Sequence, residues 1–412
     1  MSAITAKASR KMKKYAVLTR EPRCFLGSFN FSWEQRKVQD VADRFDNLRI
    51  PVAANLRVHG TTPYYGANGI QDYVEGFTHD GEFVLVAEDG ANDLKNYPVK
   101  CVNGRIWVNN HAHVLQGKAG ISDNSFLAFA ISQSDIESLL VGGSRAKLNA
   151  ETLMSIEFKL PCLQEQYRIG EYLTQLDNLI TLHQRKFEKL TNVKKSMLEK
   201  MFPQNGSSYP EIRFKGFTDP WEQRKLGELV DRVVRKNTNN ESTLPLTISA
   251  QYGLVDQITY FNNRVASRDV SNYYLVLNGE FAYNKSTSDG YPFGAVKRLD
   301  LYEKGVLSTL YIVFAPKKEQ QIDSDYLTVF FDTDRWHKGV AERAAEGARN
   351  HGLLNISAED FFDIDLSVPK DIVEQKQIGA FIRQLDSLIT LHQRELEKLK
   401  NIKKSCLENM FV

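Results

Sequence analysis

The strongest pattern along the chain is an alternation of apolar steps of four and three residues, which occurs in two separate segments. This heptad spacing is typical of an amphipathic helix that packs against another helix. Each segment covers about 40 residues, which predicts a helix about 60 Å long at 1.5 Å per residue. The first seam consists of Ile169, Leu173, Leu176, Ile180, His183, Phe187, Leu190, Lys194, Met197 and Met201. The second seam consists of Ile378, Ile382, Leu385, Ile389, His392, Leu396, Leu399, Lys403, Cys406 and Met410.

The two helical segments are near copies of each other, and so are two shorter blocks that precede the variable regions. The heptapeptide LITLHQR occupies residues 179–185 and again residues 388–394. The block SWEQRKVQDVADRF begins at Ser32, and PWEQRKLGELVDRV begins at Pro220. The residues between these blocks differ, so the pattern indicates a tandem duplication of one half of the molecule.

A lone amphipathic helix would leave its apolar stripe exposed to water, so the two matching stripes are expected to pack together. Since the first helix leads away from one variable region and the second leads back, the pair is expected to be antiparallel. Segments such as EFVLVAEDG and VLSTLYIVFAP are typical of strands. The sequence therefore predicts an α+β protein, with two globular mixed α/β domains separated by two long antiparallel helices that form a coiled coil with pseudo-two-fold symmetry.

These patterns divide the chain into six parts. Gly, Ser and Pro are frequent between the first helix and the second WEQRK block, which indicates a linker. The predicted parts are a basic extension at 1–21, a first variable domain at 22–160, a first helix at 161–203, the linker at 204–220, a second variable domain at 221–368 and a second helix at 369–412.

The composition is ordinary for a soluble globular protein, with 42% hydrophobic residues, 25% charged residues and a formal net charge of +2. The total charge therefore does not by itself indicate a nucleic-acid partner. No apolar run reaches the roughly 18–20 residues that a membrane span requires. The four cysteines are scattered without a CxxC pair, which favours reduced thiols. We therefore expect a cytoplasmic protein with no membrane partner.

Known catalytic motifs are absent or weakly matched. The GxxxxGK[ST] loop that binds nucleotide triphosphates is absent. Asp365 with Glu374-Gln375-Lys376 resembles a nuclease D…ExK site, but the first repeat has Tyr167 in place of the lysine. His111 and His113 have no evident third metal ligand, so a hydrogen-bonding or DNA-facing pair is the favoured interpretation. We expect this chain to contain no catalytic residues and no metal site.

The repeated blocks and the motifs of the variable regions together resemble the specificity subunit of type I restriction–modification systems. The resemblance covers the chain from about residue 22 onward. It depends on WEQRK at the start of each half and on the helical pattern LITLHQR…LEKL…KKS. In the first variable region it depends on YGANGI, GEFVLVAEDG and NNHAHVL, and in the second on FAYNKS, YPFGAVKRL, GVLSTLYIVF and NHGLLNIS.

The resemblance implies a function for each part. Each variable region would be a target recognition domain that reads one half of a split site in double-stranded DNA, and the helices would fix the gap between the half-sites. Two modification subunits would dock on the chain, bring S-adenosylmethionine and methylate adenine. Two motor–nuclease subunits would join them and bring ATP and magnesium chemistry. The chain itself would bind no cofactor and would not be catalytic.

Polar and basic residues on turns beside strands are the natural candidates for contacts to base edges and phosphates. For each, the alternative is a solvated loop or a structural hydrogen bond. In the first variable region the candidates are Tyr64, Tyr65, Asn68, Asn109, Asn110, His111, Arg145 and Lys147. In the second they are Tyr283, Asn284, Lys285, Ser286, Thr287, Tyr291, Arg298, Arg349, Asn350 and His351.

A second apolar set lies on the helices outside the seams, and we expect it to face the partner subunits. The alternative is that the variable domains bury it. The set consists of Tyr172, Leu179, Leu182, Val193, Phe381, Leu388, Leu391 and Ile402.

Three other interpretations stay open at this point. The chain could be a nuclease or methyltransferase with an unrecognised site. It could be a structural coiled-coil protein whose variable domains bind proteins. It could also be the specificity chain of a related system that cuts on both sides of its site.

Overall fold

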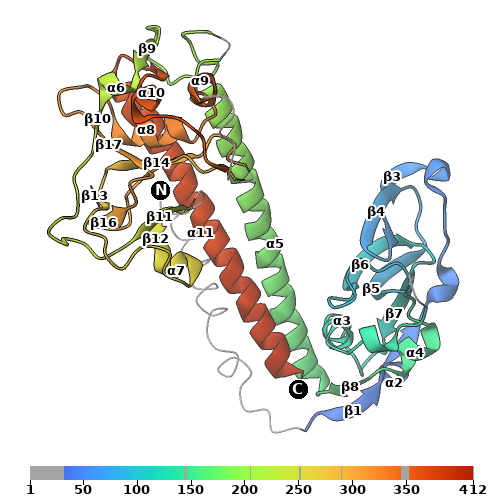
Figure 1. The fold of residues 1–412 in the computed structure, drawn as a ribbon. Helices are drawn as coiled ribbons and strands as arrows, with labels where there is room; N and C mark the ends of the chain where they lie inside the picture. The colour runs from blue at the N-terminus through green and yellow to red at the C-terminus, as the bar shows by residue number, and fades with distance from the viewer. Residues whose placement is uncertain are drawn as a thin grey trace, which may run out of the picture. The chain divides into compact units, whose positions relative to one another are not determined.

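The computed structural model describes residues 32–142, 146–204, 206–249, 252–288, 290–344 and 352–411 (Figure 1). The chain divides into two compact units. The first unit combines Met1–Gln184 with Arg394–Val412, and the second unit is Arg185–Gln393. Each unit therefore contains one globular domain and one half of each long helix. We call residues 32–160 the first domain and residues 221–368 the second domain.

The two predicted heptad segments form two uninterrupted helices, α5 (Leu163–Lys200) and α11 (Ile372–Met410), green and red in Figure 1. In the first unit, the beginning of α5 shares a core with Leu399 and Cys406, which lie at the end of α11. In the second unit, the end of α5 packs with the beginning of α11 through residues such as Met197 and Ile382. The helix segments are therefore antiparallel within each unit, and the predicted α+β class is confirmed.

The lysine of each seam makes an interhelical ion pair. In the first unit Lys403 Nζ lies 2.6 Å from Asp177 Oδ1, and in the second unit Lys194 Nζ lies 2.7 Å from Asp386 Oδ1. Lys194 and Lys403 are the equivalent seam lysines of the two copies, and the two aspartates are equivalent as well. The duplicated sequence therefore makes the same interhelical contact twice.

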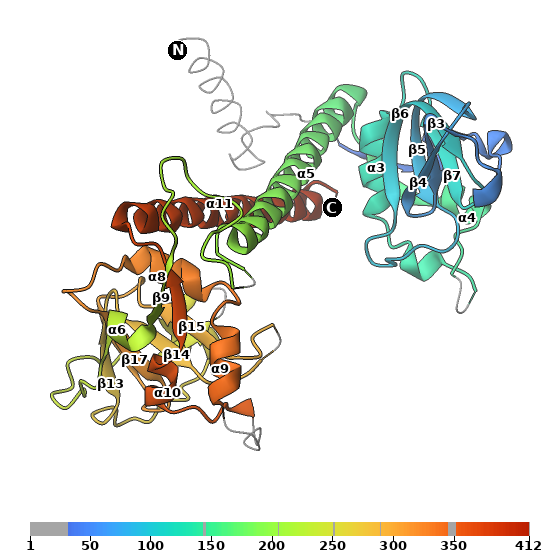
Figure 2. The ribbon, with the colours of Figure 1, turned by 90° about the horizontal axis from the view of Figure 1, so that it is seen from above.

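The first domain contains a six-stranded sheet in the order β2-β7-β5-β6-β3-β4. Its neighbouring strands are antiparallel, except that β3 and β6 are parallel. Figure 2 shows α3 along one face of this sheet. The strands are β1 (Glu34–Lys37), β2 (Ala42–Arg44), β3 (His59–Gly66), β4 (Gly69–Val74), β5 (His79–Ala87), β6 (Val99–Val108), β7 (Ala112–Gly117) and β8 (Glu157–Leu160). The helices are α2 (Val38–Val41), α3 (Asn124–Ser132) and α4 (Ala150–Ser155), with short 3-10 turns η2 (Asp46–Leu48), η3 (Ala54–Leu56) and η4 (Glu137–Leu139).

The second domain has a four-stranded sheet in the order β10-β17-β14-β15 and three separate strand pairs, β11-β12, β13-β16 and β18-β9. Its strands are β9 (Glu222–Lys225), β10 (Val230–Arg232), β11 (Leu246–Ser249), β12 (Gly253–Asp256), β13 (Tyr274–Leu277), β14 (Phe281–Asn284), β15 (Ala295–Arg298), β16 (Lys304–Leu307), β17 (Ile312–Pro316) and β18 (Asp365–Val368). Its helices are α6 (Leu226–Leu229), α7 (Gln257–Phe261), α8 (Ser324–Phe331), α9 (His337–Arg343) and α10 (Ala358–Phe362).

In both domains, the strand that enters the domain pairs with the strand that leaves it. β1 is antiparallel to β8, and β9 is antiparallel to β18. β1 and β9 carry the repeated EQRK residues, and β8 and β18 lead directly into α5 and α11. The repeated block therefore holds the two connections of each domain together at the start of its long helix. No helix in the described parts of the chain is long and apolar enough to span a membrane.

Candidate nucleic-acid and partner interfaces

A tryptophan and a glutamate begin the contact between each domain and its long helix. Trp33 Nε1 donates a hydrogen bond to Glu165 Oε1 at 3.4 Å, and Trp221 Nε1 donates to Glu374 Oε1 at the same distance. The last aromatic residue of the opposite helical segment covers each tryptophan. Phe202 lies edge-on to Trp221, with 5.8 Å between ring centroids, and the first unit repeats this contact with the equivalent phenylalanine.

A glutamine on each long helix then fixes the domain through backbone groups. In the first unit Gln166 Oε1 accepts from the backbone N–H of Asp123 at 3.0 Å, and its Nε2 donates to the carbonyl of Pro161. In the second unit Gln375 makes the same bonds to Asp323 and Pro369. The two aspartates cap α3 and α8. The long helix is thereby tied to the first turn of the helix that covers the sheet.

A glycine lets each domain approach the long helix very closely. A Cβ atom on Gly170 would lie 2.7 Å from Asp123 Oδ1 and 2.9 Å from the backbone nitrogen of Phe126. A Cβ atom on Gly379 would lie 2.9 Å from the backbone nitrogen of Tyr326. Side chains cannot be inserted here without shifting backbone. We call this repeated contact the joint, and it fastens two unlike domains in the same way.

The joint also accounts for the residues that resemble a nuclease motif. Glu374 is 1% exposed and accepts two hydrogen bonds from Arg213, at 2.7 and 2.8 Å. Asp365 lies on β18 and pairs with Lys225 at 3.2 Å. Across the described residues, no group of three or more His, Cys, Asp or Glu side chains could hold a metal ion. The arrangement therefore gives the nuclease interpretation no support.

In the first domain, the turn after β6 carries three of the predicted DNA-contact residues. The backbone N–H of Asn109 donates to the carbonyl of Tyr65 at 3.0 Å, which places this turn beside the end of β3. Asn110 is exposed at the tip of the turn. His111 is partly exposed, and its Nδ1 forms a hydrogen bond with Asp89.

Two further candidates lie at the same end of the sheet. Asn68 occupies the β3–β4 turn, where its Nδ2 donates to the carbonyl of Gly90 and its Oδ1 accepts from the backbone of Asn92. Both ends of this amide are thus used in the fold. Lys147 pairs with Glu88 at 2.9 Å, and its Nζ is otherwise close to solvent. The structure therefore gathers the candidates from three distant segments into one polar surface.

The structure removes two tyrosines from the candidate surface. Tyr64 is almost fully buried, its hydroxyl accepts from the backbone N–H of Val52, and the Arg57 guanidinium lies over its ring. Tyr65 is also buried, in the core beneath the sheet. Consecutive strand residues point to opposite faces, so the burial of both rings means that β3 is covered on each side here, and neither ring lies on the surface as predicted. Arg145 lies outside the described residues.

His113 is a buried structural residue. Its Nδ1 lies 2.7 Å from Asp46 Oδ2, and its Nε2 lies 2.9 Å from the carbonyl of Leu148. Burial acts to raise the pKa of Asp46, but the hydrogen bonds from His113 and Val114, together with the nearby charges of His113 and Arg49, lower that pKa. The hydrogen-bonding interpretation is therefore confirmed for His113, while His111 alone faces the polar surface.

In the second domain, the predicted run of polar residues forms a surface loop after β14. Asn284 Oδ1 accepts from the backbone N–H of Ser286 at 3.0 Å, and Ser286 is exposed. The backbone N–H of Thr287 donates to the carbonyl of Gly352 at 2.7 Å. Lys285, between Asn284 and Ser286, is partly buried. The loop is thus held open by a second segment that begins at Gly352.

The neighbouring candidates extend this loop. Tyr291 closes a turn by donating its backbone N–H to the carbonyl of Ser288 at 2.9 Å, and its side chain is partly exposed. Arg349, Asn350 and His351 directly precede the segment that supports the loop, but they lie outside the described residues. Contact between these residues and DNA stays a prediction.

Two candidates of the second domain are structural instead. Tyr283 is fully buried and stacks on Phe361, with 4.3 Å between ring centroids. Arg298 forms ion pairs with Asp300 and Asp325. It lies at the end of β15 that is farther from Asn284. Burial among aromatic rings in the first case and saturation by carboxylates in the second remove both from the predicted reading surface.

The second apolar set on the helices is divided by the structure. Tyr172 is buried in the core of the first unit, and Phe381 packs edge-on against Phe214. Tyr172 follows the alternative interpretation, burial, whereas Phe381 is partly buried. Leu179, Val193 and Ile402 are partly buried. The exposed members are Leu182 at 38%, Leu388 at 43% and Leu391 at 50%.

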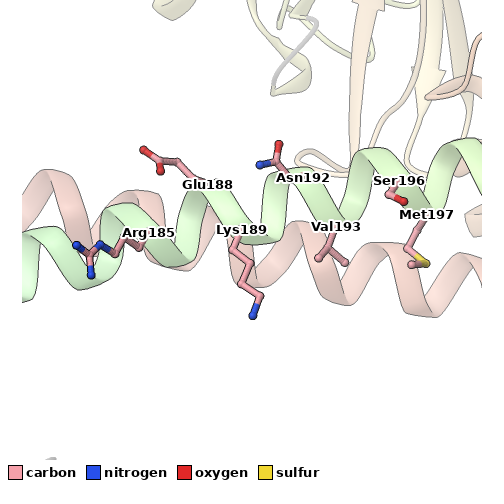
Figure 3. Close-up of a pocket in the computed structure, with 7 residues that line it drawn as sticks. All are labelled: Arg185, Glu188, Lys189, Asn192, Val193, Ser196 and Met197. Atoms are coloured by element: carbon pink, nitrogen blue, oxygen red, sulfur yellow. The ribbon is translucent and has the colours of Figure 1, made fainter. Parts of the chain in front are cut away.

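Two matching grooves lie on the long helices, one in each unit. The groove of the second unit has a volume of about 510 Å³, and Figure 3 shows its residues along α5. The groove of the first unit has a volume of about 620 Å³. The groove of the second unit is lined by Arg185, Glu188, Lys189, Asn192, Val193, Ser196 and Met197. The groove of the first unit is lined by Arg394, Glu397, Lys398, Asn401, Ile402 and Ser405.

The sequence analysis did not assign the polar residues of these grooves to a partner surface, although the signal was present. The heptad seam requires only the apolar positions to repeat. The Arg, Glu, Lys, Asn and Ser positions of the two grooves are nevertheless identical and lie outside the seam. An exposed surface that occurs twice with the same residues is suited to two copies of the same partner.

The fold defines a class of protein, a tandem duplication in which two unlike domains are joined in the same way to matched long helices. Residues 30–192 and 218–401 match the family described as Type I restriction modification DNA specificity domain. The chain therefore belongs to this family, and the resemblance in the sequence is confirmed.

Individual relatives agree with this assignment. The chain is 29% identical to a protein of Haemophilus influenzae named as a type I restriction enzyme specificity subunit, over 86% of this chain and 88% of the relative. A type I restriction enzyme specificity subunit of Methanocaldococcus jannaschii is 24% identical over 91% of each chain. The crystal structure of the type I restriction–modification S subunit from M. genitalium has a similar fold, with a TM-score of 0.64, 14% identity and coverage of 94% of this chain and 98% of that chain.

Proposed function

We propose that this chain is the non-catalytic DNA-reading subunit of a type I restriction–modification enzyme, in which each domain reads one half of a bipartite site. The joint carries this proposal, because it fastens two domains with unlike polar surfaces in the same way. Duplicated fastening with diverged surfaces is what a reader of two different half-sites requires. The long helices would then set the distance between the half-sites.

The energetics favour two rigidly held readers. Each well-read base pair contributes about 1–3 kcal/mol of discrimination, so one small domain can specify only a few base pairs. Two linked domains add their discrimination only when the connection holds them at a defined separation. A flexible connection would accept many gaps. The buried glutamine bonds and glycine contacts of the joint supply this rigidity within each unit.

The paired grooves support the proposal that two modification subunits bind one chain. Those subunits would bring S-adenosylmethionine and methylate adenine, and two motor–nuclease subunits with ATP and magnesium would complete the restriction enzyme. This chain would then need no cofactor of its own.

The proposed function is tested by methylation in the presence and absence of the modification partner. The purified chain alone is expected to leave DNA unmethylated. Together with its partner it should methylate adenine within one motif of two short blocks separated by unspecified bases. Sequencing of the methylated bases provides the measurement. Methylation by the chain alone would support the enzyme interpretation. If the complex fails to bind DNA at low salt as well as at high salt, the interpretation as a structural protein is supported instead.

Charge reversal in one groove is expected to remove one partner subunit and leave the other. The variant Arg185→Glu with Lys189→Glu changes only the groove of the second unit, and Arg394→Glu with Lys398→Glu changes only that of the first unit. Each variant should bind one modification subunit, and the combined variant should bind none, as measured by native mass spectrometry.

The matched control is Lys195→Glu with Lys404→Glu, which alters exposed lysines that line neither groove. This control should retain two partner subunits. If the variants of a single groove also retain two subunits, the grooves are not the docking surfaces. The reading function of the domains would be unaffected by that result.

A further inference from the structure

Gln71 occupies an irregular position in the hairpin at the polar end of the first domain. Tyr64 pairs with Asp72 and Tyr65 pairs with Ile70, so Gln71 is the extra residue of a β-bulge between β3 and β4. The residue is exposed. Bulges occur often beside functional sites, where they redirect a side chain. The hairpin thus aims Gln71 in a direction that regular pairing would not give.

Asn109 fixes the orientation of the Gln71 amide. Asn109 is 3% exposed, and its Oδ1 already accepts from the backbone N–H of His111 at 2.8 Å. Its Nδ2 must therefore be the atom that faces Gln71, and it donates to Gln71 Oε1 at 3.3 Å. Asn109 therefore occupies the glutamine oxygen, and among the described residues the Nε2 amino group of Gln71 donates to no group, so Nε2 is the end of the amide that is left for a ligand.

Gly66 provides the surface on which this amide rests. A Cβ atom at position 66 would lie 2.2 Å from Gln71 Nε2 and 2.6 Å from its Cδ. Any larger residue would displace the amide from this place. A buried asparagine, a bulge and a glycine thus all act on one exposed side chain. Such an arrangement costs conformational freedom in a surface glutamine and does not stabilise the core.

We propose that Gln71 is a specificity-determining residue of the first domain and reads the keto group of a guanine or thymine. The inference rests on the proposed function and deepens it. An amino group only donates, so at the keto position it pairs with guanine O6 or thymine O4 in the major groove, where adenine and cytosine carry amino groups instead. The amino groups of adenine and cytosine would meet it as donor against donor. Asn109 is the positioning residue, since it selects which end of the amide meets the base.

The substitution Gln71→Glu tests the proposal, because a glutamate accepts from Asn109 through one oxygen and places its other oxygen where Nε2 lies in the wild type. The group that meets the base then changes from donor to acceptor. In the complex with the modification partner, DNA randomised in both half-sites is selected by binding. One position of one half-site should lose its guanine or thymine by about tenfold or more, in favour of adenine or cytosine.

The variant Asn109→Asp tests the positioning role with a separate readout. An aspartate still accepts from the backbone of His111 but cannot donate to Gln71, so the amide is free to present either end. Preference at the same base position should relax, while the other positions keep theirs. A residue that is merely structural would instead weaken all positions of that half-site together.

Two internal references keep this experiment decisive. The half-site read by the second domain should be unchanged in every variant, and the matched control Gln39→Glu alters an exposed glutamine of α2 without altering the motif. An unchanged motif with Gln71→Glu overturns the role of Gln71. Absence of any bipartite motif with the wild-type complex overturns the proposed function instead.

Discussion

Insertion of seven residues into each long helix is expected to lengthen the gap in the DNA motif by up to about three base pairs. The insertions follow Gln184 and Gln393, the residues after which the chain passes from one unit into the other. Seven residues preserve the heptad phase and add about 10 Å at 1.5 Å per residue. B-DNA rises about 3.4 Å per base pair. Both half-site sequences should stay the same, as read by sequencing of methylated bases.

An insertion into α5 alone is the control for this experiment. It shifts one seam past the other and cannot preserve both interhelical ion pairs, Lys403 with Asp177 and Lys194 with Asp386. We expect that variant to be less stable and to lose methylation. If the paired insertion leaves the gap unchanged, the helices do not set the spacing, although the domains would still be the readers.

The helices were predictable from the sequence because their pattern is long and strictly periodic. A heptad maintained over ten positions leaves little choice of structure, and duplication indicated that the two stripes are partners. The seam lysines were noted as polar positions, but their ion pairs with Asp177 and Asp386 were not predicted. Those aspartates lie beside the seam, and a periodic pattern does not specify which neighbour a long side chain will reach.

The exposure of the candidate residues was predictable at turns and less so on strands. Asn110 and His111 lie in a turn and are exposed or partly exposed, whereas Asn109 in the same turn is buried, contrary to the prediction, because its side chain bonds to His111 and Gln71. Tyr64 and Tyr283 were chosen by the same reasoning, but they lie within strands. Which residues of a strand face the core depends on the elements packed against the strand. β14, which carries Tyr283, is covered on both faces.

Gln71 was missed because a bulge has no clear signature in the sequence. The segment YGANGIQDYV suggests a hairpin with a turn at its glycines, but it does not reveal that one residue of the second strand is unpaired. The partner that orients Gln71 is 38 positions away, in the turn after β6, a strand that is parallel to β3. Long-range pairing of this kind appears only in the folded domain.

Substitution of the equivalent joint glutamates is expected to have opposite effects in the two units. Glu374→Gln should destabilise the second unit by about 3 kcal/mol, because it breaks a buried pair and leaves the Arg213 guanidinium without its carboxylate. Glu165→Gln should stabilise the first unit at neutral pH. Its Oε2 is buried and has no hydrogen-bond partner among the described residues. Hydrogen exchange of α3 and α8, compared in each variant, measures the two units separately.

The pH dependence distinguishes this explanation from a general loss of packing. Burial raises the pKa of the Glu165 carboxyl, and the hydrogen bond from Trp33 only partly opposes this. The folded first unit therefore holds its proton more tightly than the unfolded chain does, and its stability increases as the pH falls through the raised pKa. The advantage of Glu165→Gln over wild type should shrink in that window and vanish near the ordinary glutamate pKa of about 4.3. An advantage that persists at low pH would mean that the charge at this position is not the cause.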